Sequence, residues 1–145
     1  MRKQLTSFVI TCAVTIMAFT FAPACRAQSV DDGSQLVGDW TGESICVGNN
    51  PSCHDEKVIY HITKIAGEAD KFKLSADKII NGKPEWMYDL DFKYDSETRI
   101  FSGEFTNSRY HGLWEYMVKE GEMEGTLKLL PEGTVVRRIK VKKAE

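Results

Sequence analysis

Residues 85–94 constrain the fold more than any other segment, because apolar and polar side chains alternate along them with the exception of Met87. In a β-strand successive side chains point to opposite faces, so such alternation predicts a strand with one buried and one solvated face. The alternate side chains expected to face inward are Trp86, Tyr88, Leu90, Phe92 and Tyr94. We call this the inward parity, and the side chains of opposite, outward parity are Met87, Asp89, Asp91 and Lys93.

Seven further runs of about ten residues are rich in β-branched and aromatic side chains, and short stretches of Gly, Pro, Asn and Asp separate them. Connections such as Asn81-Gly82 and Glu120-Gly121 are short enough for β-hairpins, which predicts antiparallel neighbours. The seven runs span residues 36–46, 56–65, 71–80, 99–106, 112–119, 123–130 and 134–142.

Eight successive antiparallel strands with one apolar face must cover that face and both edges of the sheet. Closing the sheet into a barrel does both, so we expect an all-β fold, an eight-stranded antiparallel up-and-down barrel. An open or sandwich-like sheet is the alternative. A barrel that spans an outer membrane is disfavoured, because it needs apolar residues outside and polar residues inside.

The chain begins with the features of a secretory signal peptide. Two basic residues, Arg2 and Lys3, precede an apolar run over residues 5–22, and small residues follow up to Ala27. We therefore expect residues 1–27 to be a signal peptide, with an uncleaved anchor as the alternative. The protein would then be exported, to the periplasm or outside the cell.

Two processing sites compete at the end of this leader. Cleavage after Ala27 removes Cys12 and Cys25 and leaves an even pair, Cys46 and Cys53, in an oxidising compartment. The alternative is a lipoprotein anchored through Cys25, since residues 22–25 form a poor version of a lipoprotein box. Either route prevents an unmodified Cys25 in the mature protein.

A mature chain starting at Gln28 keeps 118 of the 145 residues, which is enough for one domain. With Arg2, Lys3 and Arg26 removed from the 19 basic residues, 16 remain against 21 acidic ones, a formal charge of −5. This charge argues against nucleic acid or anionic lipid as the main partner. We expect a flexible lead-in over residues 28–35 and a single barrel domain over residues 36–143.

The triplet Gly38-Asp39-Trp40 resembles the Gly-x-Trp signature at the first strand of lipocalins and other calycins, a group of eight-stranded barrels. The resemblance implies that Trp40 closes the barrel floor and packs against an arginine of the last strand, Arg137 or else Arg138. Other lipocalin motifs and the helix after the barrel are missing, so the resemblance concerns the fold rather than the family.

A narrower resemblance covers the first hairpin. The segment W-T-G-E-S-x-C at residues 40–46, followed by C-H-D-E at residues 53–56, resembles small exported bacterial proteins of uncharacterised function. It implies no activity.

Cys46 and Cys53 enclose six residues of turn-forming composition, and in an exported protein they are expected to form a disulfide. Closing a loop of about eight residues should stabilise the fold by roughly 2–3 kcal/mol. A redox or metal role is the alternative. However, redox pairs usually have two intervening residues, and His54 and His61 are an odd number of positions apart, so on a strand they would face opposite sides. We therefore predict no metal site and no cofactor.

Motifs for hydrolytic catalysis are missing from the sequence. It contains neither a Gly-x-Ser-x-Gly elbow nor a His-Glu-x-x-His pair. The carboxylates of Asp89 and Asp91 are expected on a solvated face, where their pKa values suit acid–base chemistry poorly. The sequence therefore predicts no catalytic residue and a protein that is not an enzyme.

The inward-facing aromatic residues remain as the candidate functional feature. They line either a pocket for a small hydrophobic or amphipathic ligand or a filled core, since side chains can occupy the whole interior of an eight-stranded barrel. An inward Arg137 would need Trp40, a carboxylate or a ligand anion as its partner. The candidate lining residues are Trp40, Gly42, Ser44, Tyr60, Trp86, Tyr88, Phe101, Trp114, Tyr116 and Arg137.

The leading functional hypothesis is a non-catalytic barrel that binds a small apolar ligand. The second hypothesis is a periplasmic protease inhibitor, because exported eight-stranded barrels with one early disulfide resemble bacterial metalloprotease inhibitors. Such an inhibitor would act through its N-terminal segment and one rim of the barrel.

Overall fold

The computed structural model describes residues 31–145, so the predicted signal peptide, both processing sites and the first residues of the lead-in lie outside the described part. Within the described residues, no helix has the length and apolar character that crossing a bilayer requires. A short 3-10 helix and eight strands follow one another: η1 (Ser34–Leu36), β1 (Gly38–Cys46), β2 (Glu56–Lys64), β3 (Lys71–Ile80), β4 (Lys83–Asp95), β5 (Ile100–Thr106), β6 (His111–Lys119), β7 (Glu122–Leu129) and β8 (Thr134–Lys143).

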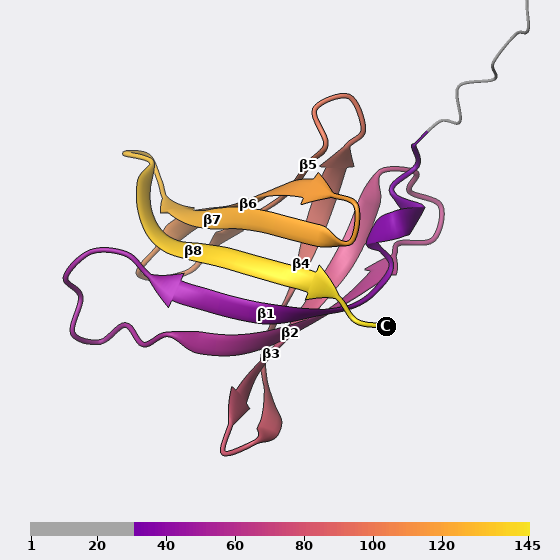
Figure 1. Ribbon diagram of the computed structural model, residues 1–145. Helices are drawn as coiled ribbons and strands as arrows, with labels where there is room; N and C mark the ends of the chain where they lie inside the picture. The colour runs from indigo at the N-terminus through magenta and orange to yellow at the C-terminus, as the bar shows by residue number, and fades with distance from the viewer. Residues whose placement is uncertain (1–30) are drawn as a thin grey trace, which may run out of the picture.

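Every strand pairs antiparallel with its neighbours in the sequence, and β8 pairs with β1, which closes the sheet into a barrel (Figure 1). The predicted eight-stranded up-and-down barrel is confirmed. Most strand bounds lie within two residues of the expected runs. The β3–β4 ladder continues to Ile80 and Lys83 because Asn81 and Gly82 both adopt positive φ, which makes a two-residue turn.

The predicted disulfide is also present. Cys46 at the end of β1 is bonded to Cys53, and the loop between them lies at one end of the barrel. The backbone N–H of Cys46 donates to the Asp55 carboxylate at 2.8 Å, and that of Val47 donates to the carbonyl of Val136 in β8 at 2.9 Å. These bonds fix the loop to the barrel rim. This rim is called the open end below.

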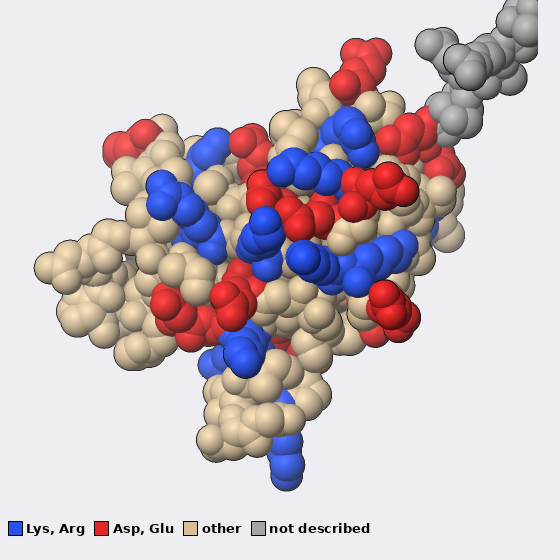
Figure 2. All heavy atoms as spheres, in the orientation of Figure 1, with Lys and Arg blue, Asp and Glu red and all other residues tan. Residues whose placement is uncertain are grey.

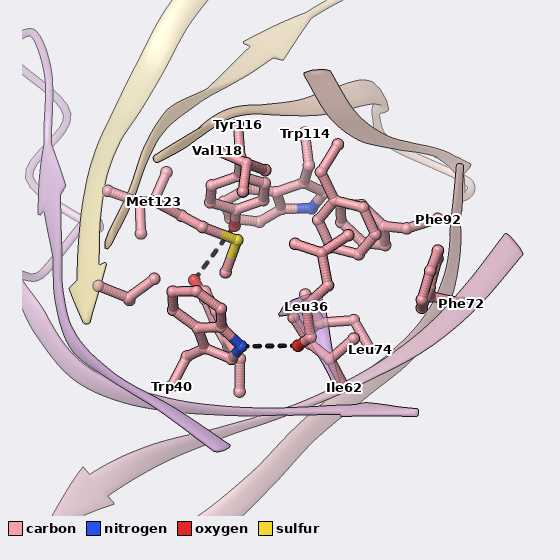
Figure 3. Packing of buried hydrophobic residues seen from close by; sticks show 14 of the residues in the cluster. Leu36, Trp40, Ile62, Phe72, Leu74, Phe92, Trp114, Tyr116, Val118 and Met123 are labelled. Atoms are coloured by element: carbon pink, nitrogen blue, oxygen red, sulfur yellow. Dashed lines mark hydrogen bonds between the residues drawn. The ribbon is translucent and has the colours of Figure 1, made fainter. Parts of the chain in front are cut away.

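The opposite end, called the closed end, is filled by apolar side chains. Leu36 from η1 is completely buried and plugs the barrel, and its carbonyl accepts a hydrogen bond of 2.8 Å from Nε1 of Trp40 (Figure 3). The side chains buried with them come from the seven strands β2 to β8: Ile62, Phe72, Leu74, Phe92, Phe101, Tyr116, Val118, Met123 and Val141.

Residues 31–35, which were expected to belong to a flexible lead-in, contact the closed end. The Tyr94 hydroxyl donates to the Asp31 carboxylate at 2.7 Å, and Nζ of Lys64 lies 2.9 Å from the Asp32 carboxylate. Nζ of Lys143 donates to the carbonyl of Gln35 at 2.6 Å. This segment therefore holds the plug in place rather than extending freely into solvent.

The ladder between β4 and β5 is the weak seam of the barrel. It consists of three residue pairs, from Lys93 opposite Ser102 to Asp95 opposite Ile100, although β4 is 13 residues long. Residues 83–92 of β4 pair only with β3, and the end of the β3–β4 hairpin projects beyond the barrel (Figure 1). The seam is therefore open toward the open end.

Candidate functional site

Three tyrosines meet in the middle of the barrel. The hydroxyl of Tyr116 donates to that of Tyr60 at 3.4 Å, and their rings meet edge to face with centroids 6.1 Å apart. Burial raises the pKa of Tyr60 to about 12 and raises the pKa values of Tyr88 and Tyr116 well above their ordinary value. These phenols therefore remain protonated at physiological pH, so they add polar groups to the interior but no charge.

Arg137 points inward, as its parity predicts, and its guanidinium is bonded to groups of the protein itself. Nη1 donates to the Ser44 hydroxyl at 2.9 Å and lies 3.1 Å from the Glu56 carboxylate, while Nη2 donates to the His54 carbonyl at 3.1 Å. The Arg137 side chain is 16% exposed. A carboxylate of the protein itself thus compensates the charge, so Arg137 does not require a ligand anion.

The expected contact between Trp40 and Arg137 is wrong. In the β1–β8 ladder Trp40 lies opposite Lys143, whereas Arg137 lies opposite Cys46 at the other end of the strand. Nζ of Lys143 is 5.7 Å from the centroid of the Trp40 ring and takes the place expected for the arginine. Arg138 does not replace it either, because it pairs with Ile45 near the open end. The floor position of Trp40 itself matches the expectation.

A partly enclosed cavity of about 230 Å³ lies beside the seam between β4 and β5. The rings of Tyr88 and Trp114 stack along one side of it, with centroids 5.9 Å apart and an angle of 24° between the planes. The Trp114 ring is in turn parallel to that of Tyr116, with centroids 6.4 Å apart. The lining residues are Tyr88, Asp89, Leu90, Phe105, Asn107 and Trp114.

Trp86 was expected to face inward but lies on the outside of the barrel, where it is 65% exposed. The ladder with β3 shifts by one residue here: Tyr88 pairs with Ala76, but Trp86 pairs with Asp77, which leaves Met87 as an extra residue. Asp77 faces outward, so its partner Trp86 does too. Nε1 of Trp86 donates to the Asp89 carboxylate at 3.1 Å on the outer surface.

Gly42 and Ser44, two of the candidate lining residues, do not border this cavity. A Cβ atom on Gly42 would lie 2.0 Å from the Lys140 carbonyl oxygen, so this glycine permits a close approach of β1 and β8. The Ser44 hydroxyl is bonded to Arg137. Phe101 stacks on Phe92 with centroids 4.6 Å apart and belongs to the packed interior.

Of the ten predicted lining residues, the cavity therefore brings together Tyr88 and Trp114. The prediction missed Leu90 and Phe105, although both have inward parity on their strands. It also missed Asn107, which follows β5, and Asp89, whose outward parity places it at the edge of the seam. Nothing in the sequence shows that the β4–β5 ladder ends early, and that ending puts these residues at a cavity.

No protein-family model matches the chain, and no curated protein matches it in a sequence comparison. Among solved structures, a variant of the fluorescent protein UnaG is similar with a TM-score of 0.50 and 13% identity, covering 77% of this chain and 97% of that chain. Echinococcus granulosus fatty-acid-binding protein 1 gives a TM-score of 0.49 at 14% identity, covering 77% and 98%. The siderocalin Ex-FABP gives 0.37 at 14%, covering 77% and 71%.

At such low identity the similarity concerns the fold alone. It supports the predicted lipocalin- or calycin-like barrel. The resemblance of residues 40–56 to exported bacterial proteins is not tested by these comparisons and stays a prediction.

Proposed function

We propose that this protein is a non-catalytic binding protein whose ligand is a small, uncharged, largely apolar molecule held beside the β4–β5 seam. The observation that carries the proposal is the cavity of about 230 Å³ walled by Tyr88, Leu90, Phe105 and Trp114. Ligand sites are typically concave and lined by apolar and aromatic side chains with a few polar groups, such as Asn107 here.

The size of the cavity limits the ligand. Drug-sized pockets have volumes of about 300–1,000 Å³, and an apolar cavity of about 150 Å³ binds benzene. A cavity of about 230 Å³ thus fits one aromatic ring or two fused rings, or a short aliphatic chain. A long-chain fatty acid or haem would require the packed closed end to open.

The charges in and near the cavity disfavour an anionic ligand, because Asp89 is the one charged residue of the lining and Arg137 elsewhere in the interior is already paired. Glu56 already neutralises Arg137, and the buried tyrosines stay protonated. A carboxylate brought into this interior would have to displace Glu56 from the guanidinium, which exchanges one ion pair for another without a net gain. This narrows the earlier hypothesis of a hydrophobic or amphipathic ligand to a neutral one.

Isothermal titration calorimetry tests the proposal with two probes, 2-naphthol as a small neutral ligand and hexadecanoate as a long anionic one. We expect saturable binding of 2-naphthol only. Leu90→Trp, which fills the cavity, should weaken that binding at least about tenfold. Met117→Trp, which introduces the same ring at an exposed position outside the cavity, should leave it unchanged. No saturable binding of 2-naphthol, or equal binding to Leu90→Trp, would contradict the proposal.

Export is the second part of the proposal. The bond between Cys46 and Cys53 supports it, because disulfides form and persist in oxidising compartments. The intact mass of the protein recovered from a bacterial host decides between cleavage after Ala27 and lipidation at Cys25. An unprocessed mass would contradict both.

The inhibitor hypothesis gains no support from the described residues. It requires a free N-terminal segment, whereas Asp31 and Asp32 are bonded to Tyr94 and Lys64, and Leu36 is buried as the plug. Releasing this segment to a protease would uncover the closed end of the barrel. We therefore do not carry the hypothesis further.

A further inference from the structure

The end of the β3–β4 hairpin forms a two-stranded ribbon that projects from the barrel (Figure 1). It comprises residues 77–86 and is called the projecting ribbon below. Pairing between β2 and β3 stops at Lys78, and β4 pairs with β5 only from Lys93 onward. The outer part of the ribbon therefore has no neighbouring strand on either side.

The register of the ribbon sorts its side chains into two unlike faces, because residues directly opposite each other share a face. Ile79 lies opposite Pro84, and Asp77 lies opposite Trp86. On this face the only charged group, Asp77, is bonded to His61 at 3.3 Å. The other face carries the pairs Lys78 with Glu85 and Ile80 with Lys83. The projecting ribbon is thus amphipathic, with an apolar face of Ile79, Pro84 and Trp86.

An added strand is a poor partner for this ribbon. Pro84 has no N–H to donate to a new ladder, and lysines such as Lys78 and Lys83 are the residues with which natural proteins protect sheet edges. The apolar face is also too narrow for a stable protein interface, which buries about 800 Å² on each partner. Edge pairing and a large protein interface are therefore both disfavoured.

A lipid surface fits the ribbon better. Tryptophan is enriched where membranes meet water, since its ring is apolar and its N–H polar, and Trp86 is 65% exposed. Residues 78–84 contain two lysines and no acidic residue, although the whole chain has a formal charge of −2. Figure 2 shows the end of the ribbon as tan and blue atoms, whereas red and blue alternate on the barrel. The projecting ribbon as a whole is neutral, because Asp77 and Glu85 balance the two lysines, but its tip, residues 78–84, is positively charged and thus suits an anionic surface.

We infer that the projecting ribbon docks the barrel onto the surface of an anionic lipid bilayer. Ile79 and Trp86 enter the interface between headgroups and acyl chains, and the long side chains of Lys78 and Lys83 reach the lipid phosphates. This inference goes beyond the proposed ligand site and does not rest on it, because it uses a different surface and a different partner.

Co-sedimentation with vesicles of phosphatidylcholine and phosphatidylglycerol tests the inference, with the protein expressed from the full chain. Trp86→Ala should weaken binding roughly tenfold through lost apolar burial. The double variant Lys78→Gln/Lys83→Gln should weaken it by roughly 30-fold, since each lysine near an anionic surface contributes about fivefold. Matched controls away from the ribbon are Ile45→Ser, another exposed apolar residue, and Lys71→Gln/Lys142→Gln, another lysine pair.

All variants share the same N-terminus, so any membrane affinity of residues 1–30 cancels between ribbon variants and controls. We expect the controls to bind as the parent protein does. We also expect the fluorescence of Trp86, the most exposed of the three tryptophans, to shift to the blue with vesicles. The inference is overturned by no binding, by equal binding to vesicles of phosphatidylcholine alone, or by equal losses in ribbon variants and controls. Thermal unfolding of each variant confirms that it is folded.

Discussion

The two ends of the barrel are built from the same eight strands but are filled differently. At the closed end Leu36 lies inside the sheet, and the Trp40, Phe72 and Met123 side chains pack with it to leave a continuous core (Figure 3). At the open end the ring of Trp114 lies beside a cavity of about 230 Å³. Strand number and alternation are the same at both ends, so they do not determine whether the interior is filled.

What separates the ends is one local feature at each. The chain before β1 supplies a plug for the closed end, with Leu36 completely buried. Among residues 31–145 no corresponding segment plugs the open end, and the β4–β5 ladder stops after three pairs, on the side of the cavity. In this barrel the cavity thus lies where the ladder is incomplete, although aromatic side chains line the interior at both ends.

The largest change in stability is expected from substitutions of the three tryptophans. One lies at the closed end, one at the cavity and one on the projecting ribbon. Trp40→Ala should lower the free energy of unfolding by about 3–5 kcal/mol, because it removes a fully packed ring and a hydrogen bond. Trp114→Ala should lower it by about 1–2 kcal/mol less, since its ring already borders a cavity. Trp86→Ala should remain within about 0.5 kcal/mol of the parent.

Urea denaturation of the three variants measures these differences. Equal losses for Trp40→Ala and Trp114→Ala would mean that the two ends are equally well packed, and the comparison would fail. A large loss for Trp86→Ala would mean that the ribbon is part of the core, which contradicts its exposure.

Removing the disulfide tests whether the open end is an independent region. Cys46→Ser/Cys53→Ser should lower the free energy of unfolding by about 2–3 kcal/mol, since the bond closes a loop of about eight residues. Hydrogen exchange should become faster in residues 45–56 at the open rim, while the amides of Trp40 and Ile62 at the closed end keep their relative protection. Uniform loss of protection at both ends would instead show one cooperative unit.

Breaking the ion pair between Arg137 and Glu56 at the open end should have a somewhat smaller effect on the free energy of unfolding. Arg137→Ala leaves the Glu56 carboxylate and the His54 carbonyl without their partner, which should lower the free energy of unfolding by about 1–3 kcal/mol. Arg137→Met/Glu56→Leu, which removes both charges, should recover most of that loss. If the double variant is as unstable as Arg137→Ala, the guanidinium itself is the essential group and the pairing argument is wrong.

The sequence was sufficient to predict the barrel because each strand repeats the same information. Alternation identifies the strands, short turns make neighbours antiparallel, and the need to cover the edges closes the sheet. The pairing of Cys46 with Cys53 followed from cysteine count and spacing. These are local signals, and the tertiary structure does not override them.

The site was less predictable because it depends on register. A single extra residue, Met87, turns Trp86 from the inner face to the outer one, and alternation alone does not reveal such a bulge. The pairing of Trp40 with Lys143 rather than Arg137 is likewise fixed by where β8 meets β1. Register also brings Arg137 to Glu56, so this ion pair at the open end could not be predicted from the alternation of side chains alone.

The smallest expected effect tests whether contacts on the outer surface add to the stability of the closed end. His61 in β2 lies between Asp39 in β1 and Asp77 in β3, with ring nitrogens 2.7 and 3.3 Å from their carboxylates, and the bond to Asp39 raises the pKa of the imidazole. Only the doubly protonated ring donates to both partners.

Because the folded-state pKa of His61 lies above its unfolded value, the stabilisation is fully present below about pH 6.5 and is lost as the pH rises through the folded-state pKa. His61→Gln should therefore cost more free energy of unfolding in acid than in base. The difference should be below about 1 kcal/mol because the side chain is 40% exposed. Urea denaturation below and above the folded-state pKa measures this difference. In the background of Asp39→Asn/Asp77→Asn the difference should disappear. A larger cost in base would mean that the neutral ring holds the three strands together.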